Sequence, residues 1–212
     1  MKLKKSFPAG IRNIIFDLGG VIVDIDVAAT LHAFEKLNIG GLDISAIHPH
    51  QQGFFLDYEL GDITGEEFIS AIRARYGCEG VADAQIWAAW TALLQKPDMA
   101  RFGLLENVRG NYNIYLLSNT NKAHIDAVKE GFRQVSGGRE FETFFDGCFY
   151  SHRMHLRKPG ERIYREVLEL TGAFAGETIF IDDNECNFTG AKAAGLHVYH
   201  LTGGESINDL FK

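Results

Sequence analysis

The sequence lacks the features that typify membrane, disulfide-rich and nucleic-acid-binding proteins. No apolar run approaches the length of a membrane span, and no apolar signal-peptide segment follows the basic first residues. Its three cysteines are widely spaced without a C-x-x-C pair, so neither a disulfide framework nor a zinc site is indicated. A formal net charge of −7 offers no basic surface for nucleic acid or anionic lipid. We therefore expect a soluble, cytoplasmic protein with no nucleic-acid or membrane partner; its oligomeric state stays open.

Short apolar segments alternate with helical patterns over much of the chain. Strands are expected at 13–16, 112–117, 144–150, 178–181 and 197–200, and helices at about 122–130, 159–170 and 188–194. Strands that alternate with helices predict a parallel sheet with right-handed crossovers. The predicted fold class is α/β, with a three-layered, Rossmann-like core.

The segment from residue 27 to residue 97 shows only helical periodicity. Its apolar residues recur at spacings of three and four, as at Phe68, Ile69 and Ile72. Thr64 and Glu67 have the spacing of a capping box at the start of that helix. We expect residues 1–26 and 98–212 to form the core, and residues 27–97 to form an inserted, all-helical domain.

Polar residues follow three of the predicted strands at the point where each strand ends. Asp17 follows the first strand, Ser118 and Asn119 follow the second, and Asp182 and Asp183 follow the fourth. Ligands of open parallel sheets bind at the carboxyl ends of the strands. These side chains are therefore expected to gather at one edge of the sheet.

The types of these residues favour chemistry on a phosphate group. Neighbouring carboxylates such as Asp182 and Asp183 repel each other unless a cation or proton lies between them. Mg²⁺ prefers oxygen ligands and often binds one or two carboxylates together with a substrate phosphate. Lys158 precedes Pro159 at a predicted helix N-terminus, where backbone N–H groups also attract anions. A carboxylate such as Asp17 can attack phosphorus and form an aspartyl-phosphate that water then hydrolyses.

Four segments resemble, in order, the four motifs of the haloacid dehalogenase (HAD) superfamily: FDLGGVIVD, LLSNTN, RKPGERIY and FIDDNECN. The helical insertion after the first motif resembles the C1-type cap of that superfamily, and the match covers nearly the whole chain. The residues of these motifs are similar to those of the α-D-glucose-1-phosphatase-like branch. The resemblance implies a Mg²⁺-dependent phosphatase that acts on a small phosphorylated metabolite, such as a hexose-1-phosphate, through an aspartyl-phosphate.

The resemblance also implies a role for each matching residue. Asp17 would be the nucleophile. Ser118 and Asn119 would bind the phosphoryl group, and Lys158 would neutralise its charge. The implied Mg²⁺ ligands are Asp17, the backbone carbonyl of Gly19, Asp183, Asp182 in a secondary role, and Asn187 through a water molecule.

Gly19 is a departure from the pattern. Phosphatases of the superfamily usually carry a second Asp here, which protonates the leaving group, and such help is worth about 10²–10⁴-fold in rate. Three explanations stay open. The leaving group is good enough without an acid, as an anomeric oxygen is; or Asp24, Asp26 or a histidine of the inserted domain replaces it; or the protein is a weak catalyst that binds or regulates. The dehalogenases of the superfamily also lack this Asp, but they need no metal, and the pair Asp182-Asp183 argues against that activity.

Overall fold

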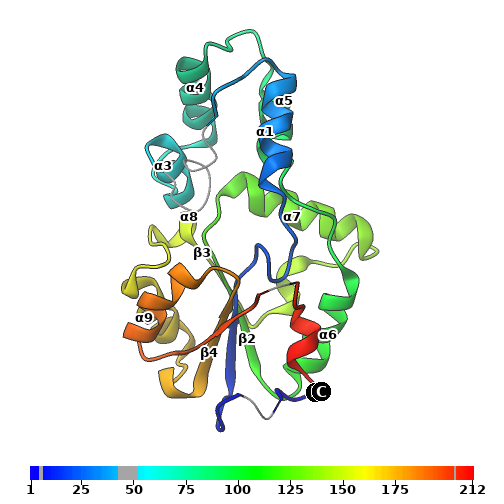
Figure 1. Ribbon diagram of the computed structural model, residues 1–212, viewed down its shortest axis with the longest axis vertical. Coiled ribbons are helices and arrows are strands. Elements are labelled where there is room, and N and C mark those ends of the chain that lie inside the picture. Colours follow the sequence, from blue (N-terminus) through cyan, green and yellow to red (C-terminus); the bar gives the residue numbers. More distant parts are fainter. Residues whose placement is uncertain (5–6, 43–51, 203) are drawn as a thin grey trace.

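The computed structural model describes residues 1–4, 7–42, 52–202 and 204–212 (Figure 1). A five-stranded parallel sheet runs through it in the order β3-β2-β1-β4-β5. Its strands are β1 (Asn13–Phe16), β2 (Asn113–Ser118), β3 (Gly147–Tyr150), β4 (Thr178–Asp182) and β5 (His197–His200). The central strand β1 is flanked by β2 and β4, so the residues that follow these three strands lie close together.

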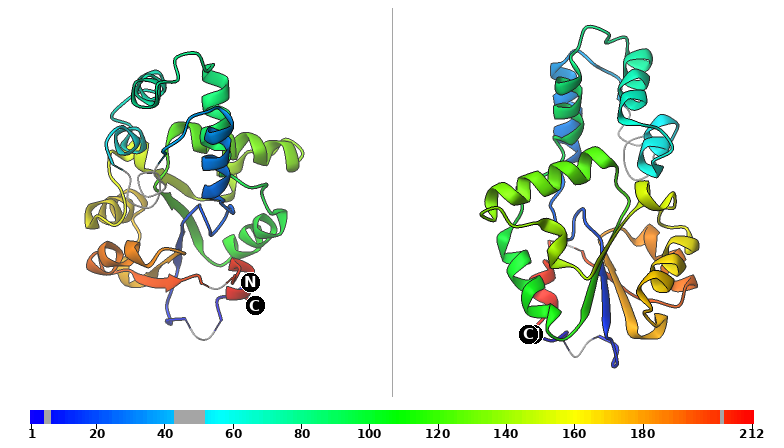
Figure 2. Two further views of the ribbon diagram at one scale, coloured as in Figure 1. Left: turned by 45° about the horizontal axis from the view of Figure 1, so that its top comes forward. Right: turned by 180° about the vertical axis from the view of Figure 1, so that it is seen from behind.

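Successive residues of the strands face opposite sides of the sheet, and helices cover both sides (Figure 2). Ile14 and Phe16 of β1 join an apolar cluster with α6 (Met99–Arg109) and α7 (Lys122–Val135). Ile15 joins a cluster on the other face with α9 (Glu161–Thr171) and α10 (Phe188–Ala193). The predicted three-layered α/β fold is therefore confirmed.

The described helices between β1 and α6 stand above the carboxyl ends of the strands (Figures 1 and 2). They are α1 (Val27–Lys36), α3 (Phe54–Leu60), α4 (Gly65–Tyr76) and α5 (Asp83–Thr91), and their buried side chains form an apolar cluster of their own. The expected capping box is present, because Glu67 Oε2 accepts from Thr64 N at 2.7 Å and Thr64 Oγ1 accepts from Glu67 N at 3.2 Å. The exact division into domains stays a prediction.

Two chain segments connect these upper helices to the sheet, and they run side by side. Ile25 and Leu94 form an antiparallel bridge, and Asp26 N donates to Leu93 O at 2.8 Å. Asp26 is also the N-cap of α1, since its Oδ1 accepts from Ala28 N at 3.0 Å. These contacts between the two connections help to position the upper helices over the sheet.

Two predicted elements begin later than the sequence suggests. The helix expected from Pro159 begins at Glu161, because residues 157–160 form a turn in which Gly160 N donates to Arg157 O at 3.0 Å. The Lys158–Pro159 peptide within this turn is cis. Lys158 thus precedes the helix by three residues. The strand expected from 144 begins only at Gly147, because residues 141–144 form a 3₁₀ turn.

The remaining described helices are short: α8 (Ser151–Met154) and four 3₁₀ turns, Phe141–Phe144, Ala175–Glu177, Glu185–Asn187 and Ile207–Leu210. None of the helices in the described ranges has both the length and the apolar character needed to cross a lipid bilayer.

Candidate active site

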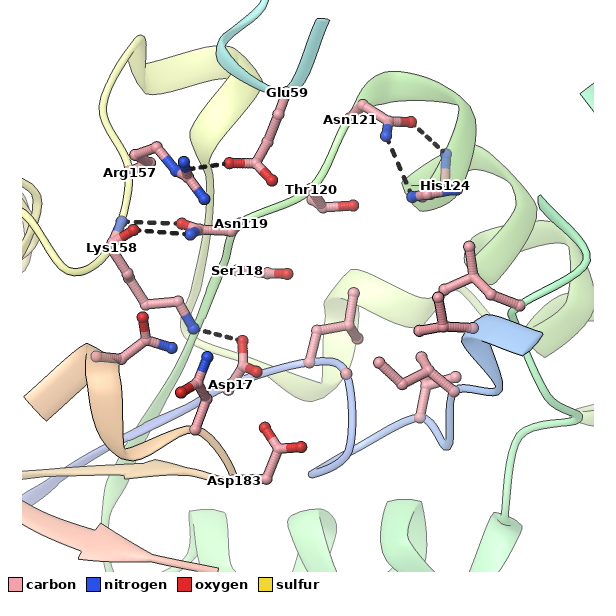
Figure 3. A pocket seen from close by; sticks show the side chains of 18 of the residues that line it. Asp17, Glu59, Ser118, Asn119, Thr120, Asn121, His124, Arg157, Lys158 and Asp183 are labelled. Carbon is pink, nitrogen blue, oxygen red and sulfur yellow. Dashed lines mark hydrogen bonds and ion pairs between the residues drawn. The ribbon is translucent and has the colours of Figure 1, made fainter. Parts of the chain in front are cut away.

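The residues predicted from the sequence meet at the carboxyl ends of β1, β2 and β4. A cavity of about 190 Å³ opens there, beneath the upper helices (Figure 3). All the predicted residues line it except Asp182, which is completely buried. The lining members of the predicted set are Asp17, Gly19, Ser118, Asn119, Lys158, Asp183 and Asn187.

A buried cation and two carboxylates lie at the inner end of the cavity. Lys158 Nζ donates to Asp17 Oδ1 at 2.6 Å and to Asp182 Oδ2 at 2.8 Å, and the Lys158 side chain is only 1% exposed. Burial alone would lower the pKa of Lys158, but the carboxylates of Asp17 and Asp182 outweigh it and raise that pKa. Burial raises the pKa of Asp17 to about 7, helped by Asp182 and opposed by Lys158.

The backbone of Lys158 is held by the loop that follows β2. Asn119 Nδ2 donates to Lys158 O at 2.9 Å, and Lys158 N donates to Asn119 Oδ1 at 2.9 Å. The side-chain amide of Asn119 is therefore engaged in positioning Lys158, a task that the sequence did not suggest. Ser118 is the last residue of β2, is nearly buried and lines the cavity beside Asp17, where Figure 3 shows its hydroxyl.

Asp182 organises the loop that follows β4. Its Oδ2 accepts from Asn187 Nδ2 at 2.9 Å, and its Oδ1 accepts from Asn184 N at 2.8 Å. Asn187 is held from the other side by the Tyr164 hydroxyl, which donates to Asn187 O at 2.6 Å. Asp182 therefore binds both the loop that follows β4 and the side chain of Lys158.

The carboxylates of this site suit a hard divalent cation. Ligand atoms of Asp17, Asp182 and Asp183 lie within 4.8 Å of one another, which no other group of three potential ligands does in the part of the chain described. The ammonium of Lys158 balances only one of these negative charges. Desolvation and the nearby Asp182 carboxylate raise the pKa of Asp183, so a cation there would relieve the repulsion. Such clustered oxygen ligands fit Mg²⁺.

The turn after Asp17 allows Asp183 to reach this cluster. Gly20 has φ +73°, and a Cβ on it would lie 2.1 Å from Asp183 Oδ2. Gly19 is different, since a Cβ there would meet only the side chain of Ile25, whose nearest atom, Cδ1, would lie 3.4 Å away, an ordinary contact. Gly20 is therefore required by the close approach of Asp183, whereas Gly19 has space for a Cβ.

Other polar residues also line the cavity, and three of them, Glu59, His124 and Arg157, are not among the residues predicted from the sequence. Glu59 of α3 forms an ion pair with Arg157, with 2.9 Å between Oε1 and Nε. His124 of α7 stacks on Trp90 with ring centroids 5.0 Å apart, and burial lowers its pKa to about 4, so its ring is neutral near pH 7. Glu59 and His124 lie in helices without any motif. Only Arg157, next to Lys158, carried a signal.

The structure narrows the choice of groups that could replace the acid missing at Gly19. Asp24 binds Arg101 at 2.7 Å and Asp26 caps α1, and neither lines the cavity. Among histidines of the upper helices, His32 is exposed away from the cavity. His48 and His50 lie outside the described residues.

Comparison with known proteins gives a consistent result. The family model described as haloacid dehalogenase-like hydrolase matches residues 11–195. A D-ribitol-5-phosphate phosphatase of Bacteroides thetaiotaomicron is 30% identical over 195 residues, covering 92% of this chain and 93% of that protein. A HAD family enzyme from the same species, crystallised with magnesium and inorganic phosphate, matches with a TM-score of 0.85 and 34% identity, over 96% of this chain and 100% of that one. A predicted HAD-like hydrolase of Porphyromonas gingivalis matches with a TM-score of 0.82 and 34% identity, over 93% and 94%.

The chain therefore belongs to the haloacid dehalogenase-like hydrolase family. It is a hydrolase of the phosphatase group within that family, whose members use Mg²⁺. The predicted enzyme class and cofactor are thus confirmed. The α-D-glucose-1-phosphatase-like branch stays a prediction.

Proposed function

We propose that this protein is a Mg²⁺-dependent phosphatase that hydrolyses a small phosphorylated metabolite through an aspartyl-phosphate on Asp17. One observation carries the proposal: the Asp17 carboxylate lies at the inner end of a cavity, 2.6 Å from the buried ammonium of Lys158 and beside Asp183. A nucleophile, a fixed positive charge and a cluster of metal ligands are the groups that phosphoryl transfer needs.

Each of the remaining residues has a proposed part in the same reaction. Lys158 neutralises the phosphoryl oxygens, and the Ser118 hydroxyl donates a hydrogen bond to one of them. The ion would be held by Asp17, Asp183 and the Gly19 carbonyl, with Asp182 and Asn187 behind them. When bound, Mg²⁺ screens the repulsion between Asp17 and the incoming phosphate and polarises that phosphate.

The reaction proceeds in two displacements. The Asp17 carboxylate forms a bond to phosphorus while the ester oxygen departs with its electron pair and takes a proton, leaving an acyl phosphate and a free alcohol. Water then attacks the phosphorus of the acyl phosphate, which releases inorganic phosphate and restores the carboxylate. The first displacement lacks an acidic side chain at Gly19, so departure of the alcohol is its demanding part.

Two substrate classes follow from different observations. Because a glycine stands at position 19, a hexose-1-phosphate is favoured, since its anomeric oxygen leaves with less need of a proton. The relative named D-ribitol-5-phosphate phosphatase instead supports an acyclic polyol phosphate, whose leaving group is a primary alcohol. Helices of the predicted cap, residues 27–97, supply part of the cavity wall and would select between the two.

Two other activities stay as competing hypotheses. A 2-haloacid dehalogenase would use the Asp17 carboxylate without a metal, and the cluster of Asp17 with Asp183 argues against it. A weak binding or regulatory protein would keep the site and bind phosphate without turnover. A panel of p-nitrophenyl phosphate, hexose-1- and hexose-6-phosphates, ribitol 5-phosphate and 2-haloacids, each with and without Mg²⁺, separates these hypotheses.

Asp17→Asn tests the covalent step directly. This change keeps the shape of the side chain and removes its attacking charge, so phosphatase activity should fall to background. Asp126→Asn is the matched control, because Asp126 is exposed on α7, pairs with Lys122 at the surface and does not line the cavity. Acid-quenched wild-type enzyme should carry the mass of one added phosphoryl group on the peptide that contains Asp17. Appreciable turnover by a verified, undeamidated Asp17→Asn protein would contradict the mechanism.

A further inference from the structure

An ion pair between an upper helix and the sheet domain borders the catalytic cavity at the end away from Asp183. Glu59 comes from α3, and Arg157 comes from the segment that leads into Lys158 (Figure 3). The two side chains are 5% and 24% exposed, respectively, so the pair is largely shielded from solvent. Both residues line the same cavity as Asp17. A substrate whose phosphate lies at Asp17 would therefore extend toward this pair.

The position of Glu59 is determined by contacts of its backbone. The Ser151 hydroxyl lies 2.9 Å from Glu59 O and accepts from Thr120 N at 2.8 Å, so α3 is tied to the loop after β2. Gly61 packs so closely on the core that a Cβ there would lie 2.2 Å from His152 O. The docking of α3 thus places the carboxylate of Glu59 at the cavity.

The charges around the cavity show what Glu59 does. Lys158 and Arg157 are adjacent cations, and Lys158 is balanced by Asp17 and Asp182. Glu59 is the carboxylate paired with Arg157. Burial raises the pKa of Glu59, and Arg157 and then Lys158 oppose that shift. Guanidinium groups match carboxylates and phosphates well, so Glu59 and an anionic group of a substrate would compete for Arg157.

We propose that Glu59 is a specificity-determining residue that restricts the enzyme to monophosphates whose remaining part carries hydroxyl groups and no second anionic group. The proposal rests on the proposed phosphatase function. Hydroxyls suit the pair because a carboxylate accepts and a guanidinium donates hydrogen bonds. A second carboxylate or phosphate on the substrate would lie beside the Glu59 carboxylate and would compete with it for Arg157. Like charges that share a desolvated site repel each other strongly.

Glu59→Gln tests this role with two substrates that differ in one group. Ribitol 5-phosphate ends in a neutral alcohol, and the corresponding ribonate 5-phosphate ends in a carboxylate. Wild-type enzyme should prefer the alcohol. In Glu59→Gln, the kcat/KM for the alcohol divided by the kcat/KM for the acid should fall by about tenfold or more, which is the usual value of a hydrogen bond to a charged group. The change should come chiefly from a lower KM for the acid. Glu66→Gln removes the same charge from an exposed position of α4 and should leave the ratio unchanged.

A second variant distinguishes binding of the acid by Arg157 from a general change of charge. In the double variant Glu59→Gln/Arg157→Gln the improved use of the acid should disappear, because no guanidinium is left to bind its carboxylate. An unchanged ratio in Glu59→Gln, an equal loss on both substrates, or persistence of the improvement in the double variant would overturn the proposal.

Failure of the proposed function gives a different result from failure of this inference. The dissociation constants of both compounds can be measured by calorimetry on Asp17→Asn protein, with and without Glu59→Gln. Binding selectivity that depends on Glu59 without any turnover by the wild type would refute the phosphatase function alone. If the wild type turns over substrate, but neither the selectivity of turnover nor that of binding changes in Glu59→Gln, the inference alone is refuted. Failure of the protein to bind either compound would refute both.

Discussion

Replacing Lys158 by Met should destabilise this protein strongly, because the ammonium is the buried partner of two carboxylates. Lys158 Nζ lies 2.6 Å from Asp17 Oδ1 and 2.8 Å from Asp182 Oδ2. The side chains of Lys158 and Asp182 are 1% and 0% exposed, respectively. Removing one partner of a buried ion pair typically costs about 3–5 kcal/mol. In a chain of this length that cost corresponds to a loss of about 6–20 °C in Tm.

The destabilisation by Lys158→Met should also grow with pH. Burial already raises the pKa of Asp17 to about 7 with Lys158 present, and loss of the ammonium moves it higher. The folded state then holds a proton that the unfolded state, with an ordinary aspartate pKa, has released. Stability therefore falls as pH rises toward the folded-state pKa, by about 1.4 kcal/mol for each further unit of pKa shift. The difference between variant and wild type should be larger at about pH 8.5 than at about pH 6.

Chemical denaturation followed by tryptophan fluorescence measures both effects. Lys122→Met is the matched control, because Lys122 pairs with Asp126 on the surface of α7 and should change stability by only about 0.5 kcal/mol. Mg²⁺ should raise the stability of Lys158→Met more than that of the wild type, since it offers the carboxylates another cation. The reasoning would be refuted if Lys158→Met and Lys122→Met unfolded at the same denaturant concentration at both pH values.

Three further predictions concern the turn after Asp17 and the metal site. Gly20→Ala should weaken Mg²⁺ binding by at least the roughly 10–100-fold seen when groups around a metal ligand are lost, because its Cβ would occupy the place of the Asp183 carboxylate. Gly19→Ala should bind Mg²⁺ with the affinity of the wild type, as measured by calorimetry. Equal affinities of the two variants would contradict this account. Asp183→Ala should abolish Mg²⁺-dependent turnover while circular dichroism shows a folded chain, and wild-type activity lost in EDTA should return with excess Mg²⁺; full activity in chelator would instead favour dehalogenation. Gly19→Asp should raise kcat/KM for hexose-6-phosphates more than for hexose-1-phosphates, by up to about 10²-fold, because only the primary alkoxide needs a proton; a wild type that prefers 6-phosphates would show that another residue supplies it.

The sheet and the inner end of the cavity could be predicted because their signals are local. Each of the strands β1, β2 and β4 is a short apolar run that ends in polar residues, and parallel strands bring their carboxyl ends to one edge. The sequence therefore predicts that Asp17, Ser118 and Asp183 meet at this edge. The predicted helix boundary near Lys158 is less accurate, since Pro159 lies in a turn and the helix begins only at Glu161.

The contacts between distant segments could not be predicted, since they depend on how the helices rotate and dock. Nothing in α3 marks Glu59, which meets Arg157 only because Ser151 and His152 determine where α3 rests on the core. Likewise, the double hydrogen bond between Asn119 and Lys158 joins segments 39 residues apart. The sequence by itself determined the chemistry at the strand ends, because spacing along a strand decides which residues reach the edge. Only the tertiary structure decided which charges face the rest of the substrate, because that depends on packing between segments whose contacts leave no local pattern.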